Sequence, residues 1–185
     1  PGYLLASPVL SFAQPVRKFE TKEILKKQIP STKEEIPVIG MGTWVTFNVG
    51  PGLELRNHRA DILNEFFKYG GGVIDCSPLY GFSAEVLGYA LRRVENKKSL
   101  FSASKVWTPW TSTGPDQMEL QRRSWKVSRF DLMQIHNLLN WEGHLETLQS
   151  YKAEGKIRYI GITSSHGRRH SELEKIMLNQ DIDFV

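Results

Sequence analysis

Short apolar runs alternate with longer amphipathic stretches from Pro37 onward, and this alternation limits the possible folds more than any other feature of the sequence. Six runs have the length and composition of strands. They span residues 38–41, 73–76, 100–104, 132–135, 157–162 and 182–185. Helices between successive strands imply parallel strands with right-handed crossovers, as in a doubly wound sheet or an eight-stranded barrel.

Three of the amphipathic stretches illustrate the helical spacing. Segment 60–69 repeats apolar residues three and four positions apart: Ile62, Leu63, Phe66 and Phe67. Ser83 is placed to cap a helix whose expected core face is Val86, Leu87, Ala90 and Leu91. A third helix is expected to stop at Gly155 and to bury Leu145, Leu148 and Tyr151.

Two short strand patterns, 24–30 and 35–39, flank the polar turn Ser-Thr-Lys and predict an N-terminal hairpin. A closed (β/α)8 barrel takes about 250 residues. With 185 residues and six strand candidates, we expect a barrel to be incomplete, lacking its C-terminal strands. Its first and sixth strands would then have unpaired edges, which favour aggregation.

Composition places the chain among globular proteins, with 40% apolar and 24% charged residues. The net charge of +4 arises from 24 basic and 20 acidic residues without a block of like charges, so no nucleic-acid partner is predicted. No run approaches the roughly eighteen apolar residues of a membrane span. Trp110, Trp125 and Trp141 are interpreted as packing or rim residues.

Metal and disulfide chemistry are not expected. Cys76 is the only cysteine, which excludes an intramolecular disulfide and a cysteine-based zinc motif, and its apolar neighbours predict an inert buried thiol. Four histidines lack metal-ligand spacing and are predicted to be solvated: His58, His144, His166 and His170.

Polar side chains stand at the ends of three consecutive strand candidates. Asp75 ends the second, with Tyr80 five residues later; Lys105 follows the third, and His136 follows the fourth. Carboxyl ends of parallel strands meet at one rim, where barrel enzymes build their active sites. Each residue alone could be an ion-pair or packing residue, but the four together favour a site.

The four residue types suit the reduction of a carbonyl group. A phenol with a pKa of about 10 is a weak acid unless a cation stabilises its phenolate, and Lys105 could supply that cation. Asp75 could hold Lys105 in place, while His136 could orient a substrate carbonyl toward Tyr80.

Five motifs together resemble the aldo-keto reductase family over residues 24–185: Gly-Met-Gly-Thr-Trp, Asp-Cys-Ser-Pro-Leu-Tyr-Gly, Ser-Lys-Val-Trp, Asp-Leu-Met-Gln-Ile-His-Asn and Ile-Arg-Tyr-Ile-Gly-Ile-Thr. The resemblance implies a (β/α)8 TIM barrel with an N-terminal β-hairpin across its floor. It implies hydride transfer from NADPH, less often NADH, to an aldehyde or ketone. The family's tetrad would fall on Asp75, Tyr80, Lys105 and His136, with Tyr80 as general acid.

The resemblance also implies the cofactor contacts. Gly42, Thr43 and Trp44 would lie beside the nicotinamide ribose, and Trp107 would wall the substrate pocket. The family usually has Ser-Asn after the fifth strand to hold the carboxamide, where this sequence has Thr163-Ser164. The family's loops that grip the adenosine phosphate follow the seventh and eighth strands, which these 185 residues do not reach.

Two other functions remain open. Some proteins similar to this family keep the barrel and cofactor but act as binding or regulatory partners, without catalysis. A lyase or isomerase on the same barrel would not need the tetrad.

The first thirteen residues, PGYLLASPVLSFA, are apolar and small and are followed by charged sequence. They resemble a signal-peptide remnant cleaved after Ala13, although a floppy apolar arm is the alternative. Residues 14–185 would then form one barrel domain. Export of a folded, cofactor-bearing enzyme predicts a twin-arginine signal upstream of Pro1 and a periplasmic location, with the cytoplasm as the alternative.

Overall fold

The computed structural model describes residues 24–165 and 167–185. Five parallel strands form the main sheet in the order β3-β4-β5-β6-β7, preceded by an antiparallel hairpin of β1 and β2. The strands are β1 (Lys26–Gln28), β2 (Glu35–Pro37), β3 (Met41–Gly42), β4 (Val73–Asp75), β5 (Phe101–Val106), β6 (Phe130–Ile135) and β7 (Ile157–Ile162). The βα alternation and the N-terminal hairpin predicted from the sequence are therefore confirmed.

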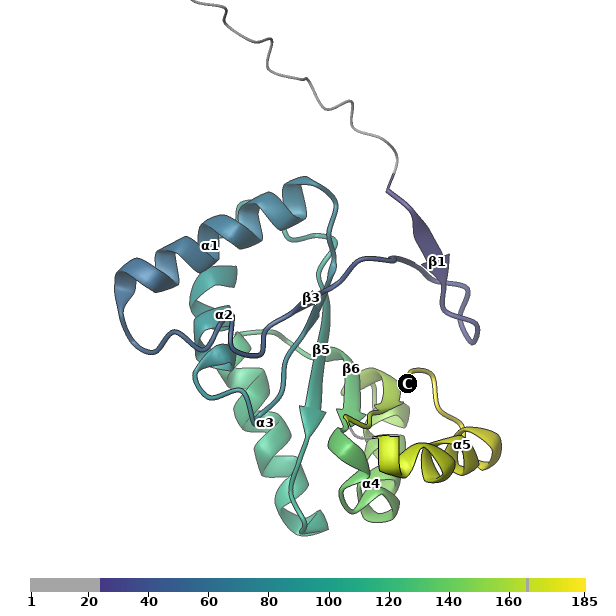
Figure 1. Cartoon of the computed structure of the whole chain (residues 1–185). Coiled ribbons are helices and arrows are strands. Elements are labelled where there is room, and N and C mark those ends of the chain that lie inside the picture. The colour runs from purple at the N-terminus through teal and green to yellow at the C-terminus, as the bar shows by residue number, and fades with distance from the viewer. Residues whose placement is uncertain (1–23, 166) are drawn as a thin grey trace, which may run out of the picture.

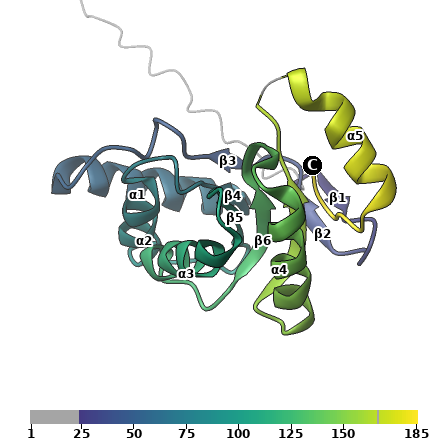
Figure 2. The same cartoon turned by 90° about the horizontal axis from the view of Figure 1, so that it is seen from below.

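A helix follows each strand of the main sheet. The α-helices are α1 (Leu53–Lys68), α2 (Ser83–Leu91), α3 (Gly114–Trp125), α4 (Trp141–Ala153) and α5 (His170–Asn179). Three 3-10 helices are η1 (Thr111–Thr113), η2 (His136–Leu138) and η3 (Gly167–Arg169). In Figures 1 and 2, α2 and α3 lie on one side of the strands and the hairpin on the other.

The larger core fills the space between the sheet and its helices. Strand residues that point outward, such as Ile74, Ile135 and Ile162, are fully buried there against helix residues such as Leu63 and Leu148. Because side chains alternate across a strand, the residues between them point to the opposite, inner face of the sheet.

The inner face near the strands' amino ends carries a second, smaller core. Phe101, Ala103, Leu132 and Tyr159 pack there with Ile29 from the hairpin turn. The hairpin therefore covers this end of the inner face and leaves the carboxyl ends of the strands open for a site.

Polar contacts fasten the hairpin turn to the sheet. Glu34 forms an ion pair with Arg158 and accepts a hydrogen bond from the Tyr159 hydroxyl at 2.5 Å. Ser31 Oγ donates to Asp183 at 2.9 Å. Contacts between residues about 125 to 150 positions apart in the sequence thus hold the hairpin against the end of the sheet.

Two strand predictions need correction. The first strand of the main sheet is Met41–Gly42, at the end of the predicted segment 38–41, and residues 182–185 contribute only one parallel bridge, between Gly161 and Phe184. Asp183, whose side chain is 1% exposed, accepts from Lys152 Nζ at 2.6 Å and from the Ile160 amide at 2.9 Å. Backbone hydrogen bonds also join this segment to β7: the Asp183 and Phe184 amides donate to the Ile160 carbonyl at 3.0 and 3.1 Å, and the Ile162 amide donates to the Phe184 carbonyl at 3.1 Å.

The predicted cap of α2 is wrong, because Ser83 is the first helical residue and makes no capping bond. Its hydroxyl instead donates to the Thr43 carbonyl at 3.0 Å, which ties the start of α2 to the loop after β3. The predicted core face of α2 is buried as expected: Val86, Leu87, Ala90 and Leu91.

The other two helices differ from their predictions in detail. Helix α1 begins at Leu53 and buries Ala60, Leu63 and Phe67, whereas Ile62 is 46% exposed. Helix α4 ends at Ala153, close to Gly155, whose φ of +72° lies in the left-handed region that glycine favours.

Cys76 packs in the core, so the prediction of a buried thiol is confirmed, and burial raises the pKa of this thiol to about 11. The prediction for His144 is wrong. Its ring is fully buried, with Nε2 2.8 Å from the Thr108 carbonyl oxygen, since α4 packs against the loop that carries Thr108. His58 and His170 are exposed as predicted, and His166 lies outside the described residues.

The three tryptophans fit packing and rim positions. Trp125 is fully buried and meets Phe130 edge to face, Trp141 packs partly buried on the core, and Trp110 is 68% exposed.

No helix in the described part of the chain is long and apolar enough to cross a membrane. Within the same residues, no group of three or more histidine, cysteine, aspartate or glutamate side chains could hold a metal ion. The expected signal-peptide remnant, residues 1–13, lies outside the described residues.

Candidate active site

Three neighbouring strands bring polar side chains to the carboxyl end of the inner face. Asp75 is the last residue of β4, Lys105 lies one residue before the end of β5, and His136 follows β6 directly. Parallel pairing sets Asp75 beside Ala103 and Lys105 beside Gln134. The predicted site residues on these strands therefore converge.

Lys105 and Asp75 form an ion pair at the centre of this group. Lys105 is 5% exposed, and its Nζ also donates to the Cys76 carbonyl at 3.0 Å. The Asp75 side chain is 35% exposed. Burial of an ammonium without such partners would be unfavourable, so the pair and the carbonyl contact fix the position of Lys105.

Gln134 holds the second oxygen of Asp75. Its Nε2 donates to Asp75 Oδ1 at 2.8 Å, while Lys105 occupies Oδ2. A β-carbon on Gly161 would lie 2.8 Å from Gln134 Cγ, so only glycine at that position leaves room for Gln134 in its present place. The carboxylate is thus oriented by neighbours on two strands.

Tyr80 lies in the loop after β4 and faces both Lys105 and His136. Lys105 Nζ is 5.3 Å from the centre of the Tyr80 ring. The rings of Tyr80 and His136 meet edge to face, with centroids 6.1 Å apart and planes at 86°. All four residues of the predicted tetrad therefore lie in one group at the rim.

The electrostatics of Tyr80 differ from the expectation that Lys105 would make the phenol more acidic. Burial, and then the negative charge of Asp75, raise the pKa of Tyr80 to about 12. The ammonium of Lys105 is paired with Asp75 and does not bring the pKa of Tyr80 below its usual value. Tyr80 keeps its proton throughout the physiological pH range.

His136 is held neutral. Burial, and then the positive charge of Lys105, lower its pKa to about 4, although Asp75 opposes the shift. Its Nδ1 lies 2.7 Å from the hydroxyl of Ser77. At neutral pH the ring is an uncharged imidazole with one nitrogen already engaged.

The loop after β3 forms one side of the rim. The Thr43 side chain is fully buried and donates to the Asp75 carbonyl at 2.8 Å, whereas Trp44 is 69% exposed. Val45 has a φ of 63°, which is strained for a β-branched residue. A β-carbon on Gly42 would meet no atom within 4 Å, so open space lies above this strand end.

Thr163 and Ser164 follow β7 at the same rim. The Thr163 amide donates to the Ile135 carbonyl at 3.0 Å, and its Oγ1 accepts from the Asn137 amide at 3.1 Å. Asn137 has a φ of 55°. These bonds bring the end of β7 beside His136, so Thr163 lies close to the group formed by the other strands.

Trp107 follows β5 and is 37% exposed. The carboxamide of Gln117 brackets its backbone, accepting from the Trp107 amide at 2.6 Å and donating to its carbonyl at 2.8 Å. The indole is therefore carried on a loop segment that α3 holds in place.

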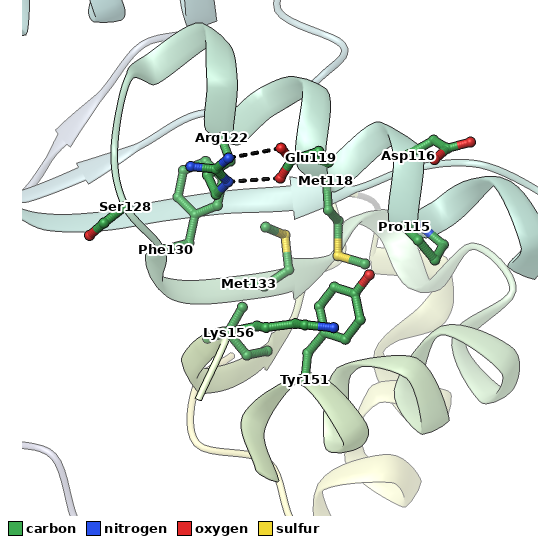
Figure 3. Close-up of a pocket in the computed structure, with 11 residues that line it drawn as sticks. Pro115, Asp116, Met118, Glu119, Arg122, Ser128, Phe130, Met133, Tyr151 and Lys156 are labelled. Carbon is green, nitrogen blue, oxygen red and sulfur yellow. Dashed lines mark hydrogen bonds and ion pairs between the residues drawn. The ribbon is translucent and has the colours of Figure 1, made fainter. Parts of the chain in front are cut away.

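A separate cavity of about 420 Å³ lies on the outer side of the sheet, between α3 and α4 (Figure 3). Met118, Met133 and Tyr151 line it, and Glu119 and Arg122 form an ion pair beside it. It contains none of the predicted site residues, which stand on the opposite face of the strands.

Ser77 and Gln134 contact the tetrad but were not predicted from the sequence. Gln134 stands two residues before His136 on one strand, so the alternation of strand side chains could have found it. Ser77 follows the end of β4, where that alternation no longer applies.

Comparisons with known proteins agree with this fold. The sequence profile of the Aldo/keto reductase family matches residues 38–185. The chain therefore belongs to the aldo/keto reductase family, and its parallel strands are part of that family's (β/α)8 barrel. A comparison with curated proteins finds no significant match.

Solved structures extend the comparison. A thermostable aldo-keto reductase crystallised with the inhibitor epalrestat is 28% identical, with a TM-score of 0.71 over 86% of this chain and 61% of that one. The holo form of a Bacillus halodurans aldo-keto reductase is 20% identical, with a TM-score of 0.70 over 86% and 56%. A Klebsiella pneumoniae aldo-keto reductase in complex with NADPH is 24% identical, with a TM-score of 0.65 over 82% and 54%. The chain thus spans between about half and two thirds of these structures.

Proposed function

We propose that this chain belongs to an NADPH-dependent oxidoreductase that reduces aldehydes or ketones to alcohols, with Tyr80 as the general acid. The observation that carries the proposal is the grouping of Tyr80 with the ion pair of Asp75 and the buried Lys105 and with a neutral His136. Membership of the aldo/keto reductase family and the NADPH complex of the Klebsiella pneumoniae relative support it.

The residues at the rim fit a nicotinamide group in part. Open space above Gly42 and the exposed indole of Trp44 suit a planar ring with its ribose, and Thr163 and Ser164 follow β7 at the same end of the sheet. In the aldo-keto reductase family the loops after the seventh and eighth strands grip the adenosine phosphate, so the described residues do not decide between NADPH and NADH.

Bound NADPH would supply the hydride that reduces the carbonyl carbon. The protein's own part is to place the carbonyl oxygen and to give it a proton. Tyr80, protonated at neutral pH, donates its hydroxyl hydrogen as negative charge develops on that oxygen. Lys105 stands by its ring to stabilise the phenolate that results.

His136 and Trp107 would orient the substrate. An uncharged imidazole can donate one hydrogen bond to the carbonyl oxygen without competing with Tyr80 as an acid. The partly exposed Trp107 offers an apolar wall, and other exposed apolar residues of the strand-end loops lie at Trp44, Leu79 and Phe82. Small apolar carbonyl compounds suit such a rim.

The first test is a titration of NADPH into this chain and into the chain extended by the remaining barrel segments, followed by nucleotide fluorescence. We expect the extended protein to bind NADPH and to reduce an aromatic aldehyde. Tyr80→Phe should leave nucleotide binding unchanged and lower kcat by about 10²-fold or more.

Either of two results would count against the proposal. Unchanged turnover in Tyr80→Phe would remove Tyr80 as the acid. Absence of NADPH binding by both proteins would favour the alternative, an inactive family member that binds or regulates a partner.

We also propose that the mature enzyme is periplasmic, from the signal-like composition of residues 1–13. Mass spectrometry of the protein in the periplasmic fraction should find an amino terminus after Ala13. A protein retained in the cytoplasm with these residues intact would contradict this location.

A further inference from the structure

Ser77 is a buried hydroxyl beside the candidate active site that no step of the proposed mechanism uses. It is 1% exposed and lies two residues after the end of β4. Its Oγ is 2.7 Å from His136 Nδ1 and accepts a hydrogen bond from the Leu79 amide at 3.3 Å. Within residues 24–165 and 167–185, Oγ has no other hydrogen-bond partner.

The number of hydrogens decides between two arrangements of this contact. A neutral imidazole has one N–H and one bare nitrogen, and a hydroxyl has one hydrogen and two lone pairs. If Nδ1 carried the hydrogen and donated it to Ser77, the buried hydrogen of Ser77 would have no acceptor among the described residues. If Ser77 donates to Nδ1, its hydrogen and its bond from Leu79 are both satisfied, as buried polar groups require.

The surroundings favour the neutral ring that this count assumes. Burial and the ammonium of Lys105 both disfavour a second proton on His136. The other ring nitrogen, Nε2, has no hydrogen-bond partner among the described residues, and the ring meets Tyr80 edge to face. Nε2 is therefore available to a ligand held beside Tyr80.

We propose that Ser77 is a positioning residue that fixes His136 as the Nε2–H tautomer, so that this nitrogen presents a hydrogen-bond donor to the substrate's carbonyl oxygen. The use of that donor rests on the proposed reductase function, whereas the tautomer itself does not. The opposite tautomer would point a lone pair at the carbonyl oxygen and repel it.

His144 provides an internal standard for the measurement. Its Nε2 lies 2.8 Å from the Thr108 carbonyl oxygen, which can only accept, so His144 must carry its hydrogen on Nε2. Its Nδ1 is buried and has no hydrogen-bond partner in the described part of the chain, which agrees with a nitrogen that carries no hydrogen. Nothing in its surroundings involves Ser77.

The test is a long-range ¹H–¹⁵N correlation spectrum of the protein, extended by its remaining barrel segments and labelled with ¹⁵N-histidine, at neutral pH. His136→Gln and His144→Gln variants assign the two rings. We expect both rings to show the Nε2–H pattern. Ser77→Ala should convert His136 to a mixture of tautomers and leave His144 unchanged, and Ser77→Thr, which keeps the hydroxyl, should restore the single tautomer.

An Nδ1–H pattern for His136 in the unmodified protein would overturn the proposal without any variant. An unchanged His136 signal in folded Ser77→Ala would overturn it as well.

Kinetics separate this inference from the proposed function. With an aromatic aldehyde, Ser77→Ala should lower kcat/KM by about 10-fold, less than the 10²- to 10³-fold loss expected when a donor is removed outright, and Ser77→Thr should recover most of it. If no variant and no unmodified protein reduces the aldehyde while the Nε2–H pattern persists, the reductase proposal fails and the tautomer assignment stands.

Discussion

The middle of the sheet and its edges hold different parts of the candidate site. Strands β4, β5 and β6 each pair with two neighbours and carry Asp75, Lys105 and His136. The predicted nicotinamide contacts stand instead on the outer strands: Gly42 ends β3, and Thr163 follows β7. The groups proposed for proton transfer are therefore held between neighbouring strands, whereas the predicted cofactor contacts stand on the outer strands of the sheet.

This difference appears in the packing as well. Lys105 is 5% exposed and bonded on two sides, while Trp44 is 69% exposed. The residues on the central strands are tightly packed, whereas those beside the edge strands are more open to solvent. Substitutions on the central strands should therefore affect both the stability of the fold and the proposed chemistry. Changes at the edge should affect stability little.

Lys105→Met should have the largest effect, because it leaves the partly buried Asp75 carboxylate without its ion partner. We expect the free energy of unfolding to fall by about 3 kcal/mol, the lower end for breaking a buried pair, since Asp75 keeps part of its surface in water. Reduction of an aldehyde should fall by about 10²-fold or more. Denaturant unfolding and steady-state kinetics measure the two effects.

Arg123→Met is the control for this prediction, since Arg123 pairs with Glu119 through a side chain that is 71% exposed. Its denaturation midpoint should match that of the unmodified protein. Equal losses of unfolding free energy in the two variants would contradict the prediction that the Asp75–Lys105 pair contributes more to stability than an exposed pair.

Gly88→Ala tests the packing of the middle region. A β-carbon there would lie 1.8 Å from the Ser124 carbonyl oxygen, where α2 and α3 touch backbone to backbone. The helices must separate, which should reduce the free energy of unfolding by about 3 kcal/mol. Gly42→Ala, at the edge, meets no atom within 4 Å and should change it by less than about 0.5 kcal/mol. Similar effects of the two alanines would remove the contrast between middle and edge.

His136 predicts how stability depends on pH. Its pKa is about 4 in the folded protein and about 6.5 in an unfolded chain, so the unfolded state binds the proton first as pH falls. Its contribution is therefore fully present above about pH 6.5 and is lost between there and pH 4. Thermal unfolding of the unmodified protein should show this loss, and His136→Gln should flatten the profile in that window. An equally steep profile in the variant would assign the effect to other groups.

Ile39→Lys should have the smallest effect on stability, but it should measurably reduce self-association of the protein. Ile39 is 71% exposed and borders an apolar groove between the hairpin and α1, beside the edge strand β3. A lysine there should leave the unfolding midpoint unchanged and reduce self-association in sedimentation velocity, because a charge at a sheet edge opposes pairing. Leu178→Lys, a 77% exposed position on α5, is the matched control, and an equal reduction there would contradict a role for the edge.

Much of the fold follows from local patterns. The apolar runs identified the strands 73–76, 100–104, 132–135 and 157–162 to within two residues at each end, because buried parallel strands are built almost entirely of apolar residues. The segment 182–185 has the same composition but forms one bridge only, and the buried carboxylate of Asp183 accepts from the Ile160 amide where a longer strand would offer a backbone carbonyl. Composition alone cannot reveal that competition.

The site divides in the same way. Asp75, Lys105 and His136 could be predicted because the carboxyl ends of parallel strands meet at one rim. Their hydrogen-bond partners could not, because those partners come from residues far apart in the sequence. His144 was predicted to be solvated and is buried, and Tyr80 was expected to be more acidic and is less so. Both differences arise because burial in the fold depends on residues that are distant from these two side chains in the sequence.

By itself the sequence determined the order of strands and helices, the hairpin and the set of side chains at the rim, since these depend on spacing along the chain. Tertiary structure alone decided that Gln134 and Lys105 share the two oxygens of Asp75, and that Ser77 bonds His136. The physical reason is that burial and pairing set hydrogen-bond partners and pKa values, and both depend on contacts between strands rather than on position within one.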